Sequence, residues 1–385
     1  MKIAIVKERA AGETRVAVSP DTVKKIIGLG HSVTIEAGAG SDSSFPDAHF
    51  TAAGATIAAS AAEALSGADL LLKVRAPTPD ELAALRPGAG VVGLLNPYNE
   101  KAFVQTLAER GVAALAMEFV PRITRAQAMD ALSSQSNLAG YRAVIEAATL
   151  YGRGFPMMMT AAGTVAAAKC FVMGAGVAGL QAIATARRLG AIVTATDVRP
   201  AAKEQVASLG AKFVAVEDEE FKQAETAAGY AKPMSAEYQA KQAALVAEHI
   251  AKQDIVITTA LIPGRAAPVL VTAAMVAAMK PGSVIVDLAA AQGGNCPLTK
   301  PDELVHTENG VTIAGFTNLP ARLPADSSSL YAKNLLNLLP LLTDKETKAF
   351  TPHWDDEIIK GAMLTRDGAM IHPTFAPPAT PAPAA

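Results

Sequence analysis

The stretch of sequence that decides the fold is Cys170–Arg199, CFVMGAGVAGLQAIATARRLGAIVTATDVR. A short apolar run at 170–173 predicts a buried strand, and a G-x-G-x-x-G motif follows it directly. Apolar residues at helical spacing over 177–189 predict a helix, and a second apolar run at 191–196 predicts the next strand. Asp197 closes that strand. This order of strand, glycine-rich turn, helix, strand and acid predicts the dinucleotide-binding unit of a Rossmann domain.

Each glycine of the turn has a separate expected role. Gly174 permits the tight turn, Gly176 lets the backbone approach a pyrophosphate, and Gly179 lets the helix pack closely against the strand. The start of the helix, at Val177 and Ala178, offers unpaired N–H groups and a partial positive charge to the phosphates. The sequence therefore predicts that the pyrophosphate of a dinucleotide binds at this turn.

The residues at the ends of the predicted strands indicate which dinucleotide is bound. The carboxylate of Asp197 can accept hydrogen bonds from both hydroxyls of an adenosine ribose, and it would repel a 2′-phosphate. We therefore expect NAD(H) rather than NADP(H), with Val198 and Arg199 among the cofactor contacts. Residues 258–261 end another buried strand, and the carboxyl ends of such strands face the ligand crevice, so Leu261 is expected to contact ribose or adenine.

Composition restricts the class of protein. A length of 385 residues predicts two domains, and a chain that is 50% hydrophobic and 18% charged fits buried parallel sheets. The net charge of −2 gives no electrostatic basis for nucleic-acid binding. Cys170 and Cys296 cannot make a disulfide framework and lack metal-ligand spacing, so no metal is expected. The chain starts with a strand-like run, and no stretch reaches the ~20 apolar residues of a membrane span, so we expect a cytosolic protein.

The pattern along the chain predicts an α/β fold with two Rossmann-like domains, in which helices flank parallel sheets and long crossing helices join the domains. The first domain is expected at 1–132 and 326–372, the NAD(H)-binding domain at 133–325, and a disordered Pro/Ala-rich tail at 373–385. Strands are expected at 2–6, 32–36, 70–74, 90–94, 113–116, 212–216, 255–259, 283–287 and 311–314, and helices at 20–29, 47–53, 79–85, 100–109, 133–151 and 326–342. We expect Asp326 or a nearby serine to cap the last helix.

Several segments together resemble one known family. These are KERAAGETRVAVSP at 7–20, the glycine-rich unit, GSVIVDLAAAQGGNCPLT at 282–299, and PRITRAQAMDALSSQSNLAGYRA at 121–143. The chain resembles the alanine dehydrogenase and transhydrogenase superfamily over about residues 1–372. The segment at 121–143 is similar to the nicotinamide-contacting loop in the NAD(H)-binding domain of proton-translocating transhydrogenases.

The chain departs from the alanine dehydrogenase pattern at the positions that carry acid–base chemistry. Alanine dehydrogenases use a Lys and an Arg to bind the substrate carboxylate, and this chain keeps Arg15 and Lys73. Their catalytic His and Asp correspond here to Asn96 and Ala291. Amino-acid oxidation needs a group that takes and returns a proton, whereas hydride transfer between two nicotinamide rings does not. We therefore expect no amino-acid oxidation, with Arg15 and Lys73 kept as structural charges; a leftover substrate site is the alternative.

The resemblance implies a catalytic loop made by Arg122, Gln127, Asp130 and Ser133. It implies that Arg122 stabilises pyrophosphate or amide oxygen and that Gln127 bridges to the second nucleotide. It also implies that Asp130 and Ser133 hold the ribose and carboxamide of the nicotinamide. The alternative is a helix cap with a solvated first turn, because Ser, Asp and Gln are common there.

Residues 217–242 form a long polar stretch with little regular signal. The resemblance implies a mobile loop that closes over bound nucleotide, with Gly229 and Tyr230 at its tip and Gln242 as a further contact. The alternative is a disordered insertion without function.

The expected function follows from these assignments and from the resemblance. The resemblance implies direct, Re/Si-specific hydride transfer from NADH on this chain to NADP+ on a partner subunit. The resemblance implies a homodimer that associates, at the inner face of the membrane, with membrane-embedded subunits that include an NADP(H)-binding domain and translocate protons. Two alternatives remain: a soluble enzyme like alanine dehydrogenase, and a non-catalytic NAD-sensing module.

Overall fold

The computed structural model describes residues 1–224 and 234–376. The chain divides into two compact units, one made of residues 1–135 and 321–385 and the other of residues 136–320. The boundary lies inside helix α6 (Ala131–Leu150), and the chain returns to the first unit through the short helix η5 (Leu319–Arg322).

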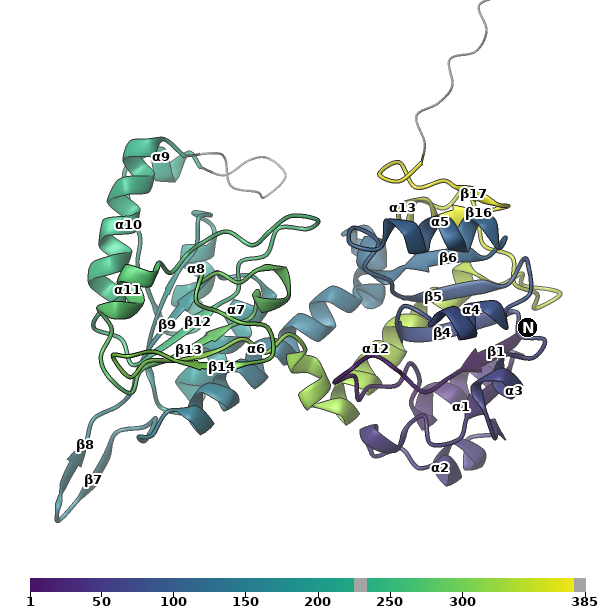
Figure 1. Ribbon diagram of the computed structural model, residues 1–385, viewed down its shortest axis with the longest axis horizontal. Helices are drawn as coiled ribbons and strands as arrows, with labels where there is room; N and C mark the ends of the chain where they lie inside the picture. The colour runs from purple at the N-terminus through teal and green to yellow at the C-terminus, as the bar shows by residue number, and fades with distance from the viewer. Residues whose placement is uncertain (225–233, 377–385) are drawn as a thin grey trace, which may run out of the picture. The chain divides into compact units, whose positions relative to one another are not determined.

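The first unit is built on a six-stranded sheet in the order β3-β2-β1-β4-β5-β6, in which every pair is parallel (Figure 1). Its strands are β1 (Lys2–Ile5), β2 (Ser32–Glu36), β3 (Thr56–Ala58), β4 (Leu70–Arg75), β5 (Gly90–Leu94) and β6 (Ala113–Ala116). Its helices are α1 (Pro20–Gly28), α2 (Asp47–Ala52), α3 (Ala61–Leu65), α4 (Pro79–Ala83), α5 (Lys101–Glu109), α12 (Pro324–Leu338) and α13 (Glu357–Ala362). Short 3-10 helices are η1 (Ser41–Ser43), η2 (Met117–Phe119), η3 (Thr124–Met129) and η6 (Leu339–Leu341), and a small hairpin joins β16 (Thr365–Arg366) to β17 (Ala369–Met370).

The second unit is built on a seven-stranded sheet in the order β11-β10-β9-β12-β13-β15-β14, parallel except at its β14 edge. Its strands are β9 (Lys169–Met173), β10 (Ile192–Thr196), β11 (Lys212–Phe213), β12 (Ile255–Thr258), β13 (Val284–Asp287), β14 (Leu304–His306) and β15 (Thr312–Ala314). Its helices are α7 (Val177–Arg188), α8 (Ala202–Ser208), α9 (Glu219–Lys222), α10 (Ala236–Ile250), α11 (Ala273–Ala277) and the 3-10 helix η4 (Ala290–Gln292). A separate hairpin pairs β7 (Met158–Thr160) with β8 (Gly163–Val165).

Both sheets are buried on two faces because successive strand residues point in opposite directions. In β9, Cys170 and Val172 join the core beneath α6, α7 and α8, whereas Phe171 and Met173 join the core beneath α10 and α11. In each unit the strand order reverses beside its first strand, next to β1 in one and β9 in the other. The predicted fold class, two Rossmann-like α/β domains with helix-flanked parallel sheets, is confirmed.

Helix α6 has 20 residues and packs tightly within the second unit. A Cβ atom at Gly140 would lie 2.0 Å from the carbonyl oxygen of Ala178, so only glycine lets α6 approach the start of α7 this closely. Within residues 1–224 and 234–376, no helix combines the length and apolarity needed to cross a membrane.

Three local expectations differ from the structure. Residues 217–242, expected as a long stretch with little regular structure, contain α9 and the start of α10. Helix α12 starts at Pro324 and no side chain caps it at Leu323, so the expected cap by Asp326 or a serine is wrong. Phe375, expected in the disordered tail, is 9% exposed and its ring packs near those of Phe119 and His372.

Candidate functional site

The glycine-rich turn between β9 and α7 has the geometry of a phosphate-binding turn. Gly174 has φ +105°, and a Cβ there would lie 2.5 Å from the Thr259 hydroxyl. A Cβ at Gly179 would lie 1.8 Å from the Gly174 carbonyl oxygen. In contrast, a Cβ at Gly176 would have no neighbour within 4 Å. Gly174 and Gly179 are therefore required by packing, whereas Gly176 faces open space into which a ligand can approach the backbone.

The N-terminus of α7 opens at this turn. Gly176 is the N-cap residue, and it supplies no side chain to bond the first N–H groups of the helix. The exposed Val177 and half-buried Ala178 begin the helix. Because uncapped helix N–H groups favour anions, this turn fits the pyrophosphate of a dinucleotide.

Asp197 lies directly after β10, and its carboxylate is held by Ala175 of the glycine-rich turn and by Arg199. Its Oδ2 accepts a hydrogen bond from the Ala175 N–H at 2.7 Å, and its Oδ1 accepts one from the Arg199 N–H at 2.9 Å. The Arg199 guanidinium donates to both oxygens, with Nε 2.9 Å from Oδ1 and Nη2 3.0 Å from Oδ2. The carboxylate is therefore held rigidly at the edge where an adenosine ribose is expected.

Exposed apolar side chains surround this edge of the sheet. Val198 is 62% exposed, Leu261 is 49% exposed and Val177 is 41% exposed. These residues follow β10, follow β12 and start α7, so they come from three neighbouring elements at the carboxyl ends of the strands. Apolar side chains left exposed together commonly mark a ligand surface, and here they suit the faces of an adenine ring.

A buried network that the sequence did not reveal supports the segment carrying Leu261. Asn295 is fully buried; its Oδ1 accepts from the Ala260 N–H at 3.1 Å, and its Nδ2 donates to the carbonyls of Ala260 (2.9 Å) and Pro268 (2.8 Å). The Asn295 N–H in turn donates to Asp287 Oδ2 at 2.7 Å. A strand-ending Asp followed by Gln-Gly-Gly-Asn was the available signal, but nothing in the sequence indicated which loop the Asn would hold.

Asp287 is the centre of that network. It is 0% exposed, and it accepts hydrogen bonds from two hydroxyls and three backbone N–H groups. The donors are Thr258 Oγ1 (3.0 Å), Ala289 N (3.0 Å), Asn295 N (2.7 Å), Cys296 N (3.1 Å) and Thr299 Oγ1 (2.7 Å). The carboxylate thus ties the end of β12 to the glycine-rich segment after β13.

Of the other residues expected to contact the nucleotide, the structure describes Gln242. Gln242 lies on α10, where its Oε1 accepts from the Val216 N–H at 2.8 Å and its Nε2 donates to the Thr196 hydroxyl at 3.2 Å. Its amide is therefore bonded within the protein, next to the end of β10. Gly229 and Tyr230 lie outside the described residues.

The expected catalytic loop belongs to the first unit and leads into α6. Arg122 and Gln127 are exposed, and their side chains make no hydrogen bond to any residue that the structure describes. Asp130 and Ser133 are half-buried and bond to each other: Asp130 Oδ1 accepts from the Ser133 N–H at 2.8 Å, and Oδ2 accepts from its hydroxyl at 2.6 Å. The helix-cap alternative therefore describes the local contacts of this pair.

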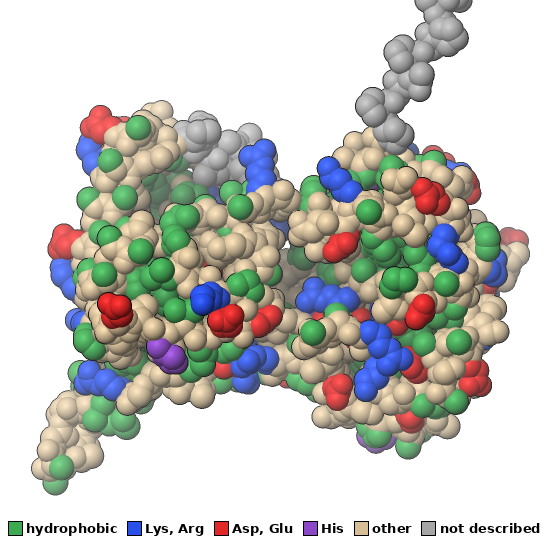
Figure 2. Space-filling model, viewed as in Figure 1, with side chains coloured by type: hydrophobic (Ala, Val, Ile, Leu, Met, Phe, Trp, Pro, Cys, Tyr) green, Lys and Arg blue, Asp and Glu red, His purple; other side chains and the backbone are tan. Residues whose placement is uncertain are grey.

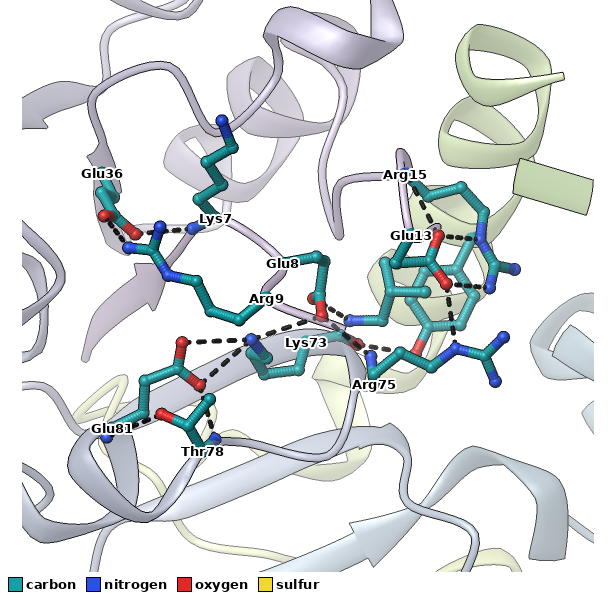
Figure 3. Close-up of polar contacts among 12 residues, drawn as sticks. Lys7, Glu8, Arg9, Glu13, Arg15, Glu36, Lys73, Arg75, Thr78 and Glu81 are labelled. Carbon is teal, nitrogen blue, oxygen red and sulfur yellow. Dashed lines mark hydrogen bonds and ion pairs between the residues drawn. The ribbon is translucent and has the colours of Figure 1, made fainter. Parts of the chain in front are cut away.

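Arg15 and Lys73 lie in a buried ionic cluster of the first unit (Figure 3). Arg15 Nε and Nη2 donate to the two carboxylate oxygens of Glu13 at 2.7 and 2.6 Å. Lys73 Nζ lies 3.3 Å from Glu8 and 3.1 Å from Glu81. Both cations are thus paired by the protein's own carboxylates, which favours structural charges over a leftover substrate site.

The cation that shares a partner with Arg15 is Arg75 rather than Lys73. Arg75 Nε lies 2.9 Å from the same Glu13 carboxylate, and its side chain is 38% exposed. Burial opposes ionisation of Glu13, but hydrogen bonds and charge from Arg15 lower its pKa to about 2. Burial instead raises the pKa of Glu8, despite the opposing charge of Lys73.

Neither position of the missing acid–base pair carries a proton-transfer group. Asn96 is exposed, and its amide oxygen accepts from Asn99 at 3.2 Å. Ala291 lies in η4 with an exposed methyl side chain. The chemistry available at these two positions therefore does not include the proton removal that amino-acid oxidation needs.

Comparisons with known proteins agree with this architecture. The model of the alanine dehydrogenase/PNT N-terminal domain matches residues 4–139, and that of the alanine dehydrogenase/PNT C-terminal domain matches residues 143–373. An NAD(P) transhydrogenase alpha-subunit protein of Rhodospirillum rubrum is 57% identical over 380 residues, covering 97% of this chain and 99% of that protein.

Two further relatives define the range of the similarity. The crystal structure of transhydrogenase from Sinorhizobium meliloti has a TM-score of 0.88 and 53% identity, covering 96% of this chain and 100% of that one. The alanine dehydrogenase of Halomonas elongata is 31% identical over 97% of this chain and 95% of its own length. The chain therefore belongs to the alanine dehydrogenase/PNT family, and its similarity is greater to NAD(P) transhydrogenase alpha subunits than to that alanine dehydrogenase.

Proposed function

We propose that this chain is the NAD(H)-binding subunit of a proton-translocating transhydrogenase and passes hydride directly to NADP+ held by a partner subunit. The observation that carries the proposal is the turn after β9, where Gly176 leaves the backbone open beside an uncapped helix and a fixed Asp197. The high identity to transhydrogenase alpha subunits supports the same assignment.

The residues divide the work between the two ends of the coenzyme. The turn at Gly174–Gly179 binds the pyrophosphate through backbone N–H groups. Asp197 accepts the hydroxyls of the adenosine ribose, which take the places that the Arg199 guanidinium holds on the carboxylate in this structure. Val198 and Leu261 cover the adenine. NADH, when bound, supplies the hydride from its dihydronicotinamide ring, and the protein contributes orientation rather than proton transfer.

The catalytic loop at residues 122–133, called the polar loop below, acts at the nicotinamide end. Arg122 and Gln127 are exposed and have no side-chain hydrogen bonds among the described residues, so they are available to ligands. Gln127 bridges to the nicotinamide of the partner's NADP(H), and Asp130 with Ser133 holds the ribose and carboxamide. These residues would hold the nicotinamide from one side, so hydride would leave from one face of the ring and the transfer would be Re/Si-specific.

Two partners complete the proposal. The partner subunits are membrane-embedded, carry the NADP(H) site and couple hydride transfer to proton movement, so this chain binds at the inner face of the membrane.

The second partner is another copy of this chain. Its support is the hairpin of β7 and β8, which projects from the second unit with hydrophobic side chains on its surface (Figure 2). Met157, Met158 and Met159 there are 61%, 44% and 75% exposed.

Alanine dehydrogenase activity is the weaker alternative. The first unit pairs Arg15 and Lys73 internally, and Asn96 and Ala291 replace the acid–base pair.

An assay of the chain with an NADP(H)-binding partner subunit, beside an assay with alanine and NAD+ alone, tests the proposal. We expect reduction of NADP+ by NADH in the first and no NADH formation in the second; the reverse result would assign the chain to alanine oxidation.

We expect Asp197→Ala to lower NADH affinity roughly 10- to 150-fold, because charge-assisted hydrogen bonds contribute about 1.5–3 kcal/mol. The same change removes the charge that repels a 2′-phosphate, so discrimination against NADPH should fall. Calorimetric titration with both coenzymes measures the two effects. Wild-type protein that binds NADPH as tightly as NADH would refute the coenzyme assignment.

A further inference from the structure

The loop expected to carry Gln127 is tied to α12 through its backbone. The carbonyl oxygen of Ala128 accepts hydrogen bonds from Asn334 Nδ2 at 2.9 Å and from Asn337 Nδ2 at 3.1 Å. Ser134, at the start of α6, donates its hydroxyl to Asn334 Oδ1 at 2.7 Å. One side of the loop is therefore fixed by two amides on the same helix.

A second tether holds the loop from the opposite end of η3. The guanidinium of Arg125 binds the Asp356 carboxylate in a fork, with Nη1 2.8 Å from Oδ2 and Nη2 2.9 Å from Oδ1. Glu357 adds a weaker contact at 3.4 Å. Asp356 is also the N-cap of α13 and accepts from the Ile358 N–H at 2.8 Å. One carboxylate thus joins the loop to the start of a helix.

Gln127 lies between these tethers. Its neighbours Ala126 and Met129 are buried in the core of the first unit, while Gln127 itself is exposed. The chain is held on both sides of Gln127, by the Arg125 side chain before it and by the Ala128 carbonyl after it. The Gln127 side chain itself has no hydrogen-bond partner among the described residues. This arrangement fixes where the side chain starts and leaves its amide available.

We propose that the Arg125–Asp356 ion pair is a positioning clamp that sets Gln127 for hydride transfer. The inference rests on the proposed function, because it names what Arg125 does for that reaction. Arg125 acts through the loop backbone and does not contact the reacting rings. The bidentate fork holds the guanidinium in one direction, which suits orientation of the loop, and the pair's partial exposure to solvent limits what it adds to folding stability.

The clamp should affect the transfer step more than coenzyme binding. Small displacements of a group that aligns reacting atoms lower the rate strongly, because the two rings must meet in a near-attack geometry. We expect Arg125→Ala to lower the transfer rate roughly tenfold, with NADH affinity within about twofold of wild type. Arg125→Lys, which keeps the charge but cannot form the fork, should be intermediate.

Two comparisons separate positioning from general destabilisation. Asp356→Asn weakens the fork while keeping a side chain that caps α13, and it should reproduce the rate loss without unfolding. Arg86→Ala removes an arginine of similar exposure from its ion pair with Asp69 in the same unit, and it should leave the rate unchanged.

The decisive test combines Arg125→Ala with Gln127→Asn in protein reconstituted with the NADP(H)-binding partner. If the clamp acts through Gln127, Arg125→Ala should cost almost no further rate once Gln127 is changed. Rate losses that simply multiply, or an Arg125→Ala rate equal to that of wild type or of Arg86→Ala, would overturn the clamp. Wild-type protein that transfers no hydride would instead refute the proposed function itself.

Discussion

Gly179→Ala is expected to reduce NADH affinity by roughly 10- to 100-fold and to destabilise the second unit. The added Cβ would lie 1.8 Å from the carbonyl oxygen of Gly174, which is backbone and cannot rotate away. Relief of such a clash requires α7 to move away from β9, at a cost of about 1–3 kcal/mol. Since the start of α7 forms the phosphate site, binding and stability fall together.

Two further glycines make this expectation specific to the turn. Gly176→Ala places its Cβ in open space, so it should leave stability unchanged and lower NADH affinity by blocking approach to the backbone. Gly152→Ala, also without a neighbour within 4 Å, should change neither property. Calorimetric titration and thermal unfolding measure the series. Normal NADH binding by the Gly176 variant would show that the pyrophosphate does not bind at this turn.

Asp287→Ala is expected to destabilise the second unit by at least about 3 kcal/mol. The substitution leaves several donors without an acceptor in a fully buried position, and each unsatisfied group costs about 1–3 kcal/mol. Asn295 then loses the contact that fixes it, so the segment carrying Leu261 should loosen as well.

Hydrogen exchange followed by mass spectrometry can localise this effect. Faster exchange is expected at 254–299, while peptides from residues 1–120 should keep wild-type protection. Asp254→Ala is the matched control, because its carboxylate is partly exposed and bonds only Lys169 N and Lys280 Nζ in the described structure. Equal effects of the two substitutions would show that Asp287 contributes no more to stability than the partly exposed Asp254 does, and would contradict its role as the centre of the network.

The nucleotide-binding half of the second unit could be predicted because residues close together in the sequence determine its structure. A Cβ atom at Gly174 or Gly179 would clash with its neighbours, so any chain that forms this turn needs glycine there. Asp197 directly follows its strand. The alternation of buried residues in β9 likewise follows from strand geometry alone. Such features leave a readable pattern because neighbours in sequence determine them.

Features that depend on distant partners were missed. Helix α10 buries only Tyr238, Val246 and Ile250, so its apolar stripe is too sparse to stand out from a polar loop. The start of this helix does carry a local signal, because serine is favoured at the N-cap position that Ser235 occupies. The pairing of Arg75 with Glu13 joins β4 to the segment after β1, and no spacing in the sequence reveals it.

In the polar loop at residues 122–133, the local contacts follow from the residue types, whereas the proposed roles follow only from the family resemblance. Residue types alone left a helix cap and a catalytic loop open, and the structure shows Asp130 and Ser133 bonded as a cap would be. The roles of Arg122 and Gln127 stay predictions that rest on the family resemblance. Local hydrogen bonds do not decide them, because a ligand can use the same groups.

The most direct test of the account follows a deuterium label. Two samples of NADH are prepared, each with deuterium at a different one of the two C4 positions of the dihydronicotinamide. Each sample is mixed with NADP+, this chain and an NADP(H)-binding partner subunit in ordinary water, and the NADPH formed is analysed by mass spectrometry. The account predicts that deuterium from only one of the two C4 positions appears in NADPH, without loss to water, because hydride passes directly between the rings. NADPH that carries no deuterium from either position would contradict direct transfer.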